Sequence, residues 1–210
     1  MKKYVCIYLS VLIHVVAPTA YAQENAPAQQ LTAAVTALDN ARSIEELQEA
    51  RNLFQRIHTV YPDDWASCYY QAYSNISLFF MNNVPDVKQK LIEEAEANVN
   101  DLKRMKNVSK EVRSEISALN GYYYYAIMSV DPQKNGPRYA NHVGSSYAEA
   151  LALNPQNPRA ILLNAYFQRN LSAFMGGTYA SFENDKAKAK ALHEQEDKTQ
   201  VMPHWWVEIE

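Results

Sequence analysis

One short pattern recurs three times in this chain and limits what it can fold into. An amide side chain, a small residue and a tyrosine follow one another at Gln71-Ala72-Tyr73, Asn120-Gly121-Tyr122 and Asn164-Ala165-Tyr166. Ala72 and Gly121 are 49 positions apart, and Gly121 and Ala165 are 44 apart. A small residue at the same place in successive units lets a partner element approach closely, and such self-similarity is typical of repeat architectures. The pattern therefore predicts a stack of similar units.

Apolar residues follow the spacing of amphipathic helices. After position 43, Leu47, Ala50 and Phe54 recur at intervals of three and four residues, which places them on one helix face. Ser43 and Glu46 form the capping-box pattern of a helix start. No segment reads as a strand, and only 5 of the 210 residues are glycine. The fold class predicted is all-α.

Eight helices with short connections are expected from this spacing and from the proline breaks. They cover residues 31–40, 43–60, 63–81, 85–102, 109–130, 139–153, 159–174 and 182–196. Residues 131–137 contain two prolines and a glycine, so a loop is predicted there.

The packing positions resemble those of the tetratricopeptide repeat. Small, bulky and closing-proline residues stand where that family has them, at Ala50, Phe54, Ile57 and Pro62, at Tyr147, Ala150 and Pro155, and at Ala72, Gly121 and Ala165. The period is longer than the family's, and Leu38 stands where a small residue belongs. The resemblance implies an α-α superhelix, or solenoid, of about four antiparallel helix pairs. It assigns residues 31–210 to one repeat domain after a flexible N-terminus at residues 23–30.

The same resemblance implies a binding face, because tetratricopeptide modules bind through the first helix of each unit. Carried onto this chain, it predicts a concave, tyrosine-rich groove with a basic end. The residues placed on that groove are Tyr69, Tyr73, Tyr122, Tyr125, Arg159, Tyr166, Arg169 and Asn170. Tyrosine suits such a role because it offers a large apolar face and a hydrogen-bonding tip at low entropic cost. The alternative, that these tyrosines pack between helices, is equally open from the sequence.

The C-terminal part is similar to repeat proteins exported by Bacteroidetes-type bacteria. An aromatic helix precedes Phe174-Met175-Gly176-Gly177, a Lys/Ala-rich helix follows, and the chain closes with Pro203-His204-Trp205. A solenoid needs capped ends. Trp205 and Trp206 are therefore expected to lie as apolar lids over the last helix pair.

The first 22 residues have the order of a secretory signal peptide. Lys2 and Lys3 precede an apolar run, Pro18 breaks it, and Ala20-Tyr21-Ala22 offers small residues for cleavage after Ala22. The run is shorter than the about 20 residues of a membrane span. We therefore expect an exported protein, periplasmic or secreted, with no membrane span after signal cleavage.

Charge and cysteine use exclude some partners. The net charge is −3, and loss of Lys2 and Lys3 with the signal would bring it to about −5. No basic stretch is present to neutralise phosphates, so nucleic acid is not an expected partner. Cys68 would be the single cysteine left after cleavage, and its apolar, aromatic surroundings predict a buried, inert thiol.

No catalytic or metal-binding motif is found. His193 and Glu196 are one helical turn apart but lack the second histidine of a zinc-protease motif. The sequence therefore predicts a non-catalytic binding or scaffold module with no cofactor and no metal, which holds another protein or a peptide segment in its groove. The alternative is a small-molecule or glycan binder that serves envelope uptake. A closed, deep pocket would favour this alternative, whereas an open groove across three units would favour the peptide.

Overall fold

The computed structural model describes residues 26–198 and 201–208. The predicted signal peptide, residues 1–22, lies outside the described residues. The described part is all-helical, as predicted. Its helices are α2 (Ala26–Asn40), α3 (Ile44–Val60), α4 (Trp65–Met81), α5 (Pro85–Arg104), α6 (Lys110–Val130), α7 (Pro132–Leu153), α8 (Pro158–Phe174) and α9 (Phe182–His193).

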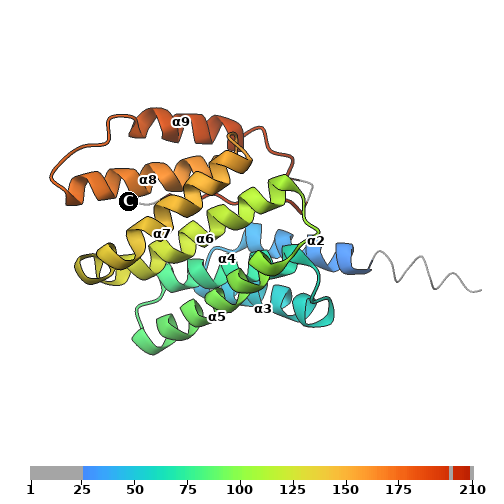
Figure 1. Cartoon of the computed structure of the whole chain (residues 1–210). Coiled ribbons are helices and arrows are strands. Elements are labelled where there is room, and N and C mark those ends of the chain that lie inside the picture. Colours follow the sequence, from blue (N-terminus) through green and yellow to red (C-terminus); the bar gives the residue numbers. More distant parts are fainter. Residues whose placement is uncertain (1–25, 199–200, 209–210) are drawn as a thin grey trace, which may run out of the picture.

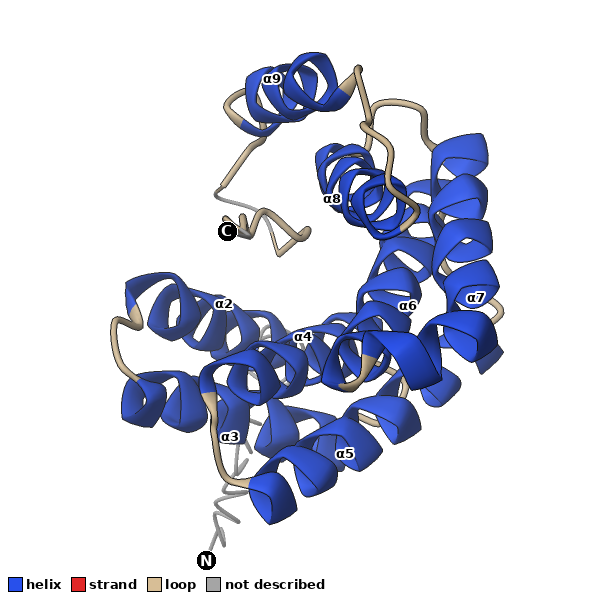
Figure 2. Ribbon diagram, turned by 90° about the vertical axis from the view of Figure 1, so that its left-hand side faces the viewer, coloured by secondary structure: helices blue, strands red, loops and turns tan. Residues whose placement is uncertain are grey.

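Successive helices form four antiparallel pairs, α2 with α3, α4 with α5, α6 with α7 and α8 with α9 (Figure 1). The first helices of the pairs also contact one another, α2 with α4, α4 with α6 and α6 with α8. Figure 2 shows these four on the inner side of the curved stack, with α3, α5 and α7 outside them. The predicted solenoid of helix pairs is confirmed, and its concave side is the side of α2, α4, α6 and α8.

Side-chain caps fix the starts of several helices. The hydroxyl of Ser43 accepts a hydrogen bond from the Glu46 amide at 3.1 Å, and that of Ser109 accepts one from the Val112 amide at 3.2 Å. These are the caps expected from the sequence. The Glu46 carboxylate accepts from the Arg42 amide at 2.6 Å, one residue before the position that a capping box predicts.

Two boundaries differ from the sequence-based expectation. Helix α7 begins at Pro132, so most of the segment predicted as a loop, Asp131–Pro137, is helical. Asp131 caps this helix by accepting from the Lys134 amide at 3.1 Å, and Pro132 occupies the first turn, where a missing N–H costs nothing. Helix α2 begins at Ala26, inside the stretch predicted as a flexible N-terminus.

The small residue of the repeated tripeptide was predicted to let a partner helix approach closely, and Gly121 does so. A Cβ atom on Gly121 of α6 would lie 2.3 Å from Cε1 of the Tyr147 ring on α7, far inside van der Waals contact. Tyr147 is fully buried there. The absence of a side chain at Gly121 therefore allows the α6–α7 pair to close over an aromatic ring.

Most of the described helices share one continuous core that runs from α2 to the middle of α8 and includes Trp205. Cys68 lies in this core, fully buried, and burial raises the pKa of its thiol to about 12. The thiol is therefore protonated at neutral pH and shielded, as predicted. Within residues 26–198 and 201–208, no helix has the length and apolar character needed to cross a membrane.

We expect Gly121→Ala to lower the free energy of unfolding by about 1–3 kcal/mol, because an overpacked core must shift the Tyr147 ring. The matched control is Gly136→Ala in α7, where no atom other than the backbone of the same helix turn lies within 4 Å of the added methyl group. The free energy of unfolding of the Gly136→Ala variant should be unchanged or higher by about 0.5–1 kcal/mol. Urea unfolding followed by circular dichroism measures both, and an equal effect of the two substitutions would contradict the close approach.

Candidate functional site

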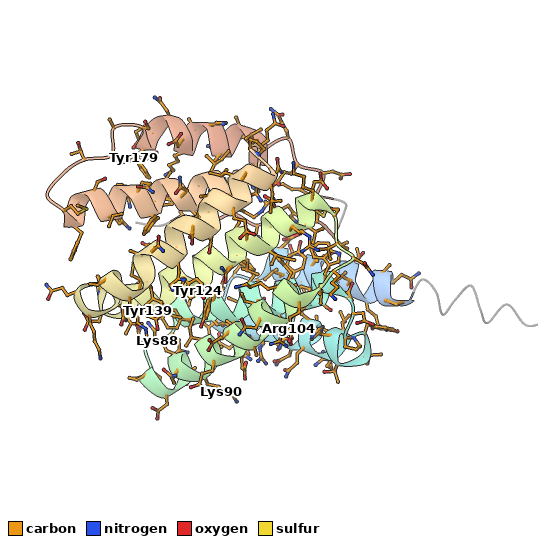
Figure 3. The ribbon with its side chains drawn as sticks, viewed as in Figure 1. Lys88, Lys90, Arg104, Tyr124, Tyr139 and Tyr179 are labelled. Atoms are coloured by element: carbon orange, nitrogen blue, oxygen red, sulfur yellow. The ribbon has the colours of Figure 1, made fainter. Side chains whose placement is uncertain are left out.

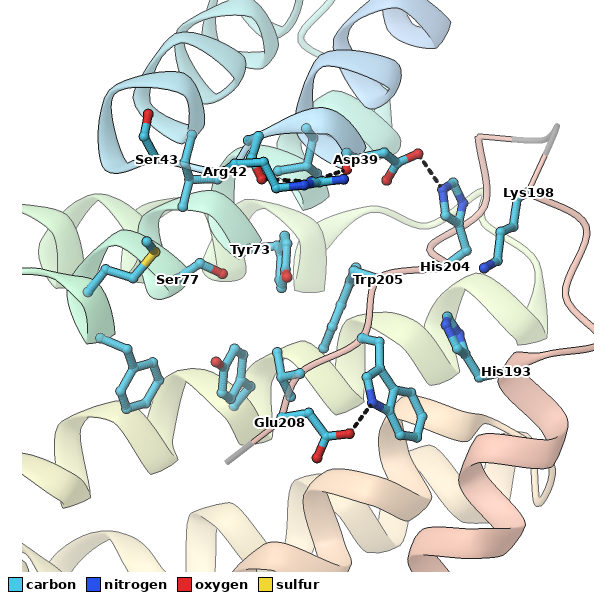
Figure 4. Close-up of a pocket in the computed structure, with 18 of the residues that line it drawn as sticks. Asp39, Arg42, Ser43, Tyr73, Ser77, His193, Lys198, His204, Trp205 and Glu208 are labelled. Atoms are coloured by element: carbon cyan, nitrogen blue, oxygen red, sulfur yellow. Dashed lines mark hydrogen bonds and ion pairs between the residues drawn. The ribbon is translucent and has the colours of Figure 1, made fainter. Parts of the chain in front are cut away.

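A cavity of about 800 Å³ lies on the concave side of the solenoid (Figure 4). Its walls come from the α2–α3 corner, from one face of α4, from α6 and from residues 201–208, which we call the C-terminal segment. The lining residues are Leu38, Asp39, Ala41, Arg42, Ser43, Leu47, Tyr73, Ser77, Phe80, Met81, Tyr122, Tyr125, His193, Lys198, His204, Trp205, Trp206, Val207 and Glu208. This volume is within the range of about 300–1,000 Å³ that is usual for small-molecule sites.

Four aromatic rings of the wall stack in a row. The Trp205 ring lies 4.4 Å from the Tyr73 ring, centroid to centroid, with an 18° angle between the planes. On its other flank Trp205 is 5.9 Å from Tyr122, which in turn is 5.4 Å from Phe80, each pair at 23°. Nearly parallel rings of this kind form a continuous apolar surface, which we call the aromatic row.

Charged side chains lie along the cavity beside the aromatic row. Arg42 is exposed, and its Nη1 donates to the backbone oxygens of Asp39 at 2.7 Å and Ala41 at 2.9 Å. These bonds fix the guanidinium near the cavity while its other nitrogens have no partner among the described residues. Lys198 also lines the cavity and lies beside His204 (Figure 4). The cavity thus combines an apolar aromatic surface with two cations and with two carboxylates, Asp39 and Glu208, which pair with His204 and Lys186.

The C-terminal segment is tied to the solenoid at several points. The Tyr70 hydroxyl donates to the Met202 carbonyl oxygen at 3.0 Å. Nε2 of His204 lies 2.9 Å from the Asp39 carboxylate on α2, an ion pair when the imidazole is protonated. Lys186 on α9 pairs with Glu208 at 2.9 Å. The segment therefore crosses the concave side from α9 to α2 and closes the cavity on one flank.

The hydroxyl groups of the aromatic row stay protonated at neutral pH. Burial raises the pKa of Tyr73 to about 12, and burial likewise holds the pKa of Tyr122 well above its ordinary value. The two phenols therefore present neutral rings and O–H groups to the cavity. No group of three histidine, cysteine or carboxylate side chains arranged to hold a metal ion occurs in the described ranges.

The structure brings three of the eight sequence-predicted groove residues to the cavity, namely Tyr73, Tyr122 and Tyr125. The other five do not line it. Tyr69, Arg159 and Tyr166 are at most 2% exposed, because the C-terminal segment covers the helix faces that an uncovered solenoid would leave open.

The remaining two predicted residues, Arg169 and Asn170, belong to α8. The Arg169 guanidinium lies over the Phe182 ring at 4.5 Å, and the Asn170 amide donates to the Tyr125 hydroxyl at 2.7 Å. Both side chains are therefore engaged with neighbouring residues and do not line the cavity.

The sequence-based prediction missed the cavity residues Phe80, Arg42 and His204. Trp205 and Trp206 were expected to cap the last helix pair. Trp206 does pack beside that pair, but Trp205 crosses the concave side to α4 and α6. The paired tryptophans after Pro203 were the available signal, since two large aromatic residues outside a helix need an apolar surface to cover.

Fold and cavity together define an all-helical solenoid with a partly enclosed aromatic binding cavity. No protein-family model matches the sequence, and no match is found among curated proteins. Among solved structures, the chain is similar to the HusA haemophore from Porphyromonas gingivalis, with a TM-score of 0.71 and 30% sequence identity over 87% of this chain and 88% of the haemophore. The chain belongs to the family of this haemophore.

A similarity to exported Bacteroidetes proteins was expected from the C-terminal part of the sequence. The match to the haemophore confirms that the chain resembles an all-helical Bacteroidetes protein. The assignment to the tetratricopeptide superfamily stays a prediction, based on the packing residues and supported by the helix pairs.

Trp205 should contribute far more to stability than its neighbour Trp206. Trp205 is 6% exposed and stacks on two helices, whereas Trp206 is only half-buried. We expect Trp205→Ala to lower the free energy of unfolding by about 3–5 kcal/mol and Trp206→Ala by about 1–2 kcal/mol. Urea titration of both variants checks this, and equal losses would show that Trp205 is not part of the core.

Proposed function

We propose that this protein is an exported, non-catalytic carrier that binds a flat, carboxylate-bearing tetrapyrrole such as haem in the cavity between α4, α6 and the C-terminal segment. The observation that carries the proposal is the aromatic row. A planar macrocycle is bound best against an extended aromatic wall that buries its apolar area, and Phe80, 38% exposed at the end of the row, is the ring most open to stacking. Tyr73, Trp205, Tyr122 and Phe80 supply such a surface.

The cations of the cavity wall match the carboxylate groups of such a ligand. Haem carries two propionate groups, and a guanidinium binds a carboxylate through two parallel hydrogen bonds. Arg42 is held by two backbone oxygens with donors to spare, so it loses little freedom when it pairs. Lys198 offers a second cation in the cavity wall.

The two cavity histidines have structural partners, and for His193 this is Oε2 of Glu196, 2.8 Å from its Nδ1. Nδ1 of His204 lies 3.0 Å from the Met202 carbonyl oxygen, and its Nε2 lies 2.9 Å from Asp39. Both ring nitrogens of His204 are thus engaged, so this imidazole holds the C-terminal segment in place. The ligand is bound chiefly by the faces of its ring and by its carboxylates.

The closed flank of the cavity favours a small molecule over an extended peptide. A peptide groove would run openly across the inner helices, but the C-terminal segment covers Tyr69, Arg159 and Tyr166, the residues that would line its length. The family relationship to a haemophore points the same way. Binding of another protein, the function first expected from the sequence, stays a prediction without a described groove to support it.

The direct test is a titration of the purified protein with haemin, followed by the absorbance of the porphyrin and by quenching of tryptophan fluorescence. We expect saturable one-to-one binding that Phe80→Ala weakens about 5- to 30-fold, because the ring loses both burial and stacking. The control is Phe174→Ala, a 63% exposed ring at the end of α8 that does not line the cavity. Absence of binding, or equal weakening by both variants, would refute the proposed site.

Arg42 should discriminate between ligands with free and with esterified carboxylates. Arg42→Gln is expected to weaken binding of the dicarboxylate porphyrin about 3- to 10-fold, because an exposed guanidinium is screened by water and its pair contributes only about as much as one ordinary net hydrogen bond. The dimethyl ester of the same porphyrin should bind both proteins equally. Arg56→Gln, an exposed arginine on α3 outside the cavity, is the control. The same loss for acid and ester would exclude Arg42 as the carboxylate partner.

A further inference from the structure

A single buried guanidinium lies behind the cavity wall, where it connects three parts of the fold. Arg159, near the start of α8, is 2% exposed. Its Nε and Nη2 donate to the Glu115 carboxylate of α6 at 2.7 and 2.8 Å. Its Nη1 and Nη2 donate to the Glu196 carboxylate in the turn after α9 at 2.9 and 2.5 Å. A buried charge requires such compensation, since an unpaired one would be strongly destabilising.

One branch of this network leads to Trp205. The Tyr69 hydroxyl donates to Oε2 of Glu115 at 3.2 Å, and its oxygen accepts from the Trp205 indole N–H at 3.0 Å. Burial, reinforced by the charge of Glu115, holds the pKa of Tyr69 well above its ordinary value, so this hydroxyl keeps the proton that it donates. The guanidinium of Arg159 itself lies 5.9 Å from the Trp205 ring.

The other branch leads to Trp206. Oε2 of Glu196 lies 2.8 Å from Nδ1 of His193, and the His193 ring stacks on the Trp206 indole at 4.9 Å with a 26° angle between planes. Both tryptophans and His193 line the cavity. Arg159, Glu115, Tyr69 and Glu196 do not.

We propose that this Arg159-centred network is a positioning device that sets the orientation of both tryptophans of the cavity wall, and so determines how tightly a flat ligand stacks there. The part of this inference that concerns ligand affinity rests on the proposed function. The part that concerns the tryptophans does not. Arg159, Glu115, Tyr69 and Glu196 act through Trp205 and Trp206, without contact with the ligand. They are positioning residues, and the two indoles form part of the cavity wall.

Tyr69→Phe isolates one branch because it removes a single oxygen between Trp205 and Glu115 and keeps the buried ring. The matched control is Tyr147→Phe, which removes the hydroxyl of another fully buried tyrosine. That hydroxyl has no hydrogen-bond partner in the described structure, and Tyr147 does not line the cavity. Glu196→Gln weakens the second branch. All variants are made in a Trp65→Phe background, so that Trp205 and Trp206 are the two tryptophans that report.

Two measurements are made on each purified variant: the near-ultraviolet circular dichroism of the tryptophans without ligand, and the affinity for haemin. We expect Tyr69→Phe and Glu196→Gln to alter the tryptophan bands and to weaken haemin binding about 3- to 10-fold, the range for one net hydrogen bond. Tyr147→Phe should match the background protein in both measurements. Unchanged helicity in the far ultraviolet confirms that the fold is retained.

The outcomes separate this inference from the proposed function. If Tyr69→Phe leaves the tryptophan bands unchanged, or changes them without any loss of affinity, the positioning role is overturned. Equal effects of Tyr69→Phe and Tyr147→Phe would also overturn it, since they would reflect a general response of the core. If the background protein binds no haemin, the proposed function fails. The ligand-free tryptophan bands then still decide whether the network positions the two indoles.

Discussion

The ion pairs of Arg159 are the interaction on which the shape of the concave side depends. Two carboxylates and one guanidinium, all largely removed from water, draw α6, α8 and the turn after α9 together. A buried charge without its partner is strongly destabilising. The three segments are therefore held in the one arrangement that keeps every charge paired. Tyr69 extends the same network to α4 and to the C-terminal segment. The closure of the cavity on this flank depends on this placement.

The helices and their pairing could be predicted from the sequence because they depend on local signals. Caps such as Ser43 and Ser109 and the apolar stripe of Leu47, Ala50 and Phe54 each act within one helix. The close contact at Gly121 was visible as a small residue in a repeated pattern. The start of α7 was not predicted, because prolines at 132 and 137 also fit a loop, and the cap on Asp131 decides between the two.

The cavity was predictable only in part, because its wall joins residues far apart in the chain. Tyr73 and Tyr122 recur in register with the repeat, so a repeat pattern can find them. Trp205 reaches them from a segment that has no repeat and no helix, and no local signal says on which surface it settles. The resemblance to the tetratricopeptide repeat placed Arg159 at the basic end of an open groove. It could not show that Glu115 and Glu196 would enclose the charge, since that depends on how the later segments fold back.

The contact between His204 and Asp39 joins the C-terminal segment to the first described helix, across 165 positions of sequence. An ordinary solenoid behaves as a linear array in which each unit senses only its neighbours, so one end can fray while the other stays intact. Here the array is closed into a ring through non-covalent contacts. Loosening of α2 and release of the C-terminal segment become one event, which makes the molecule more cooperative than its repeat architecture alone implies. Closing such a ring also requires contacts between distant residues, which form late and slowly when a chain folds.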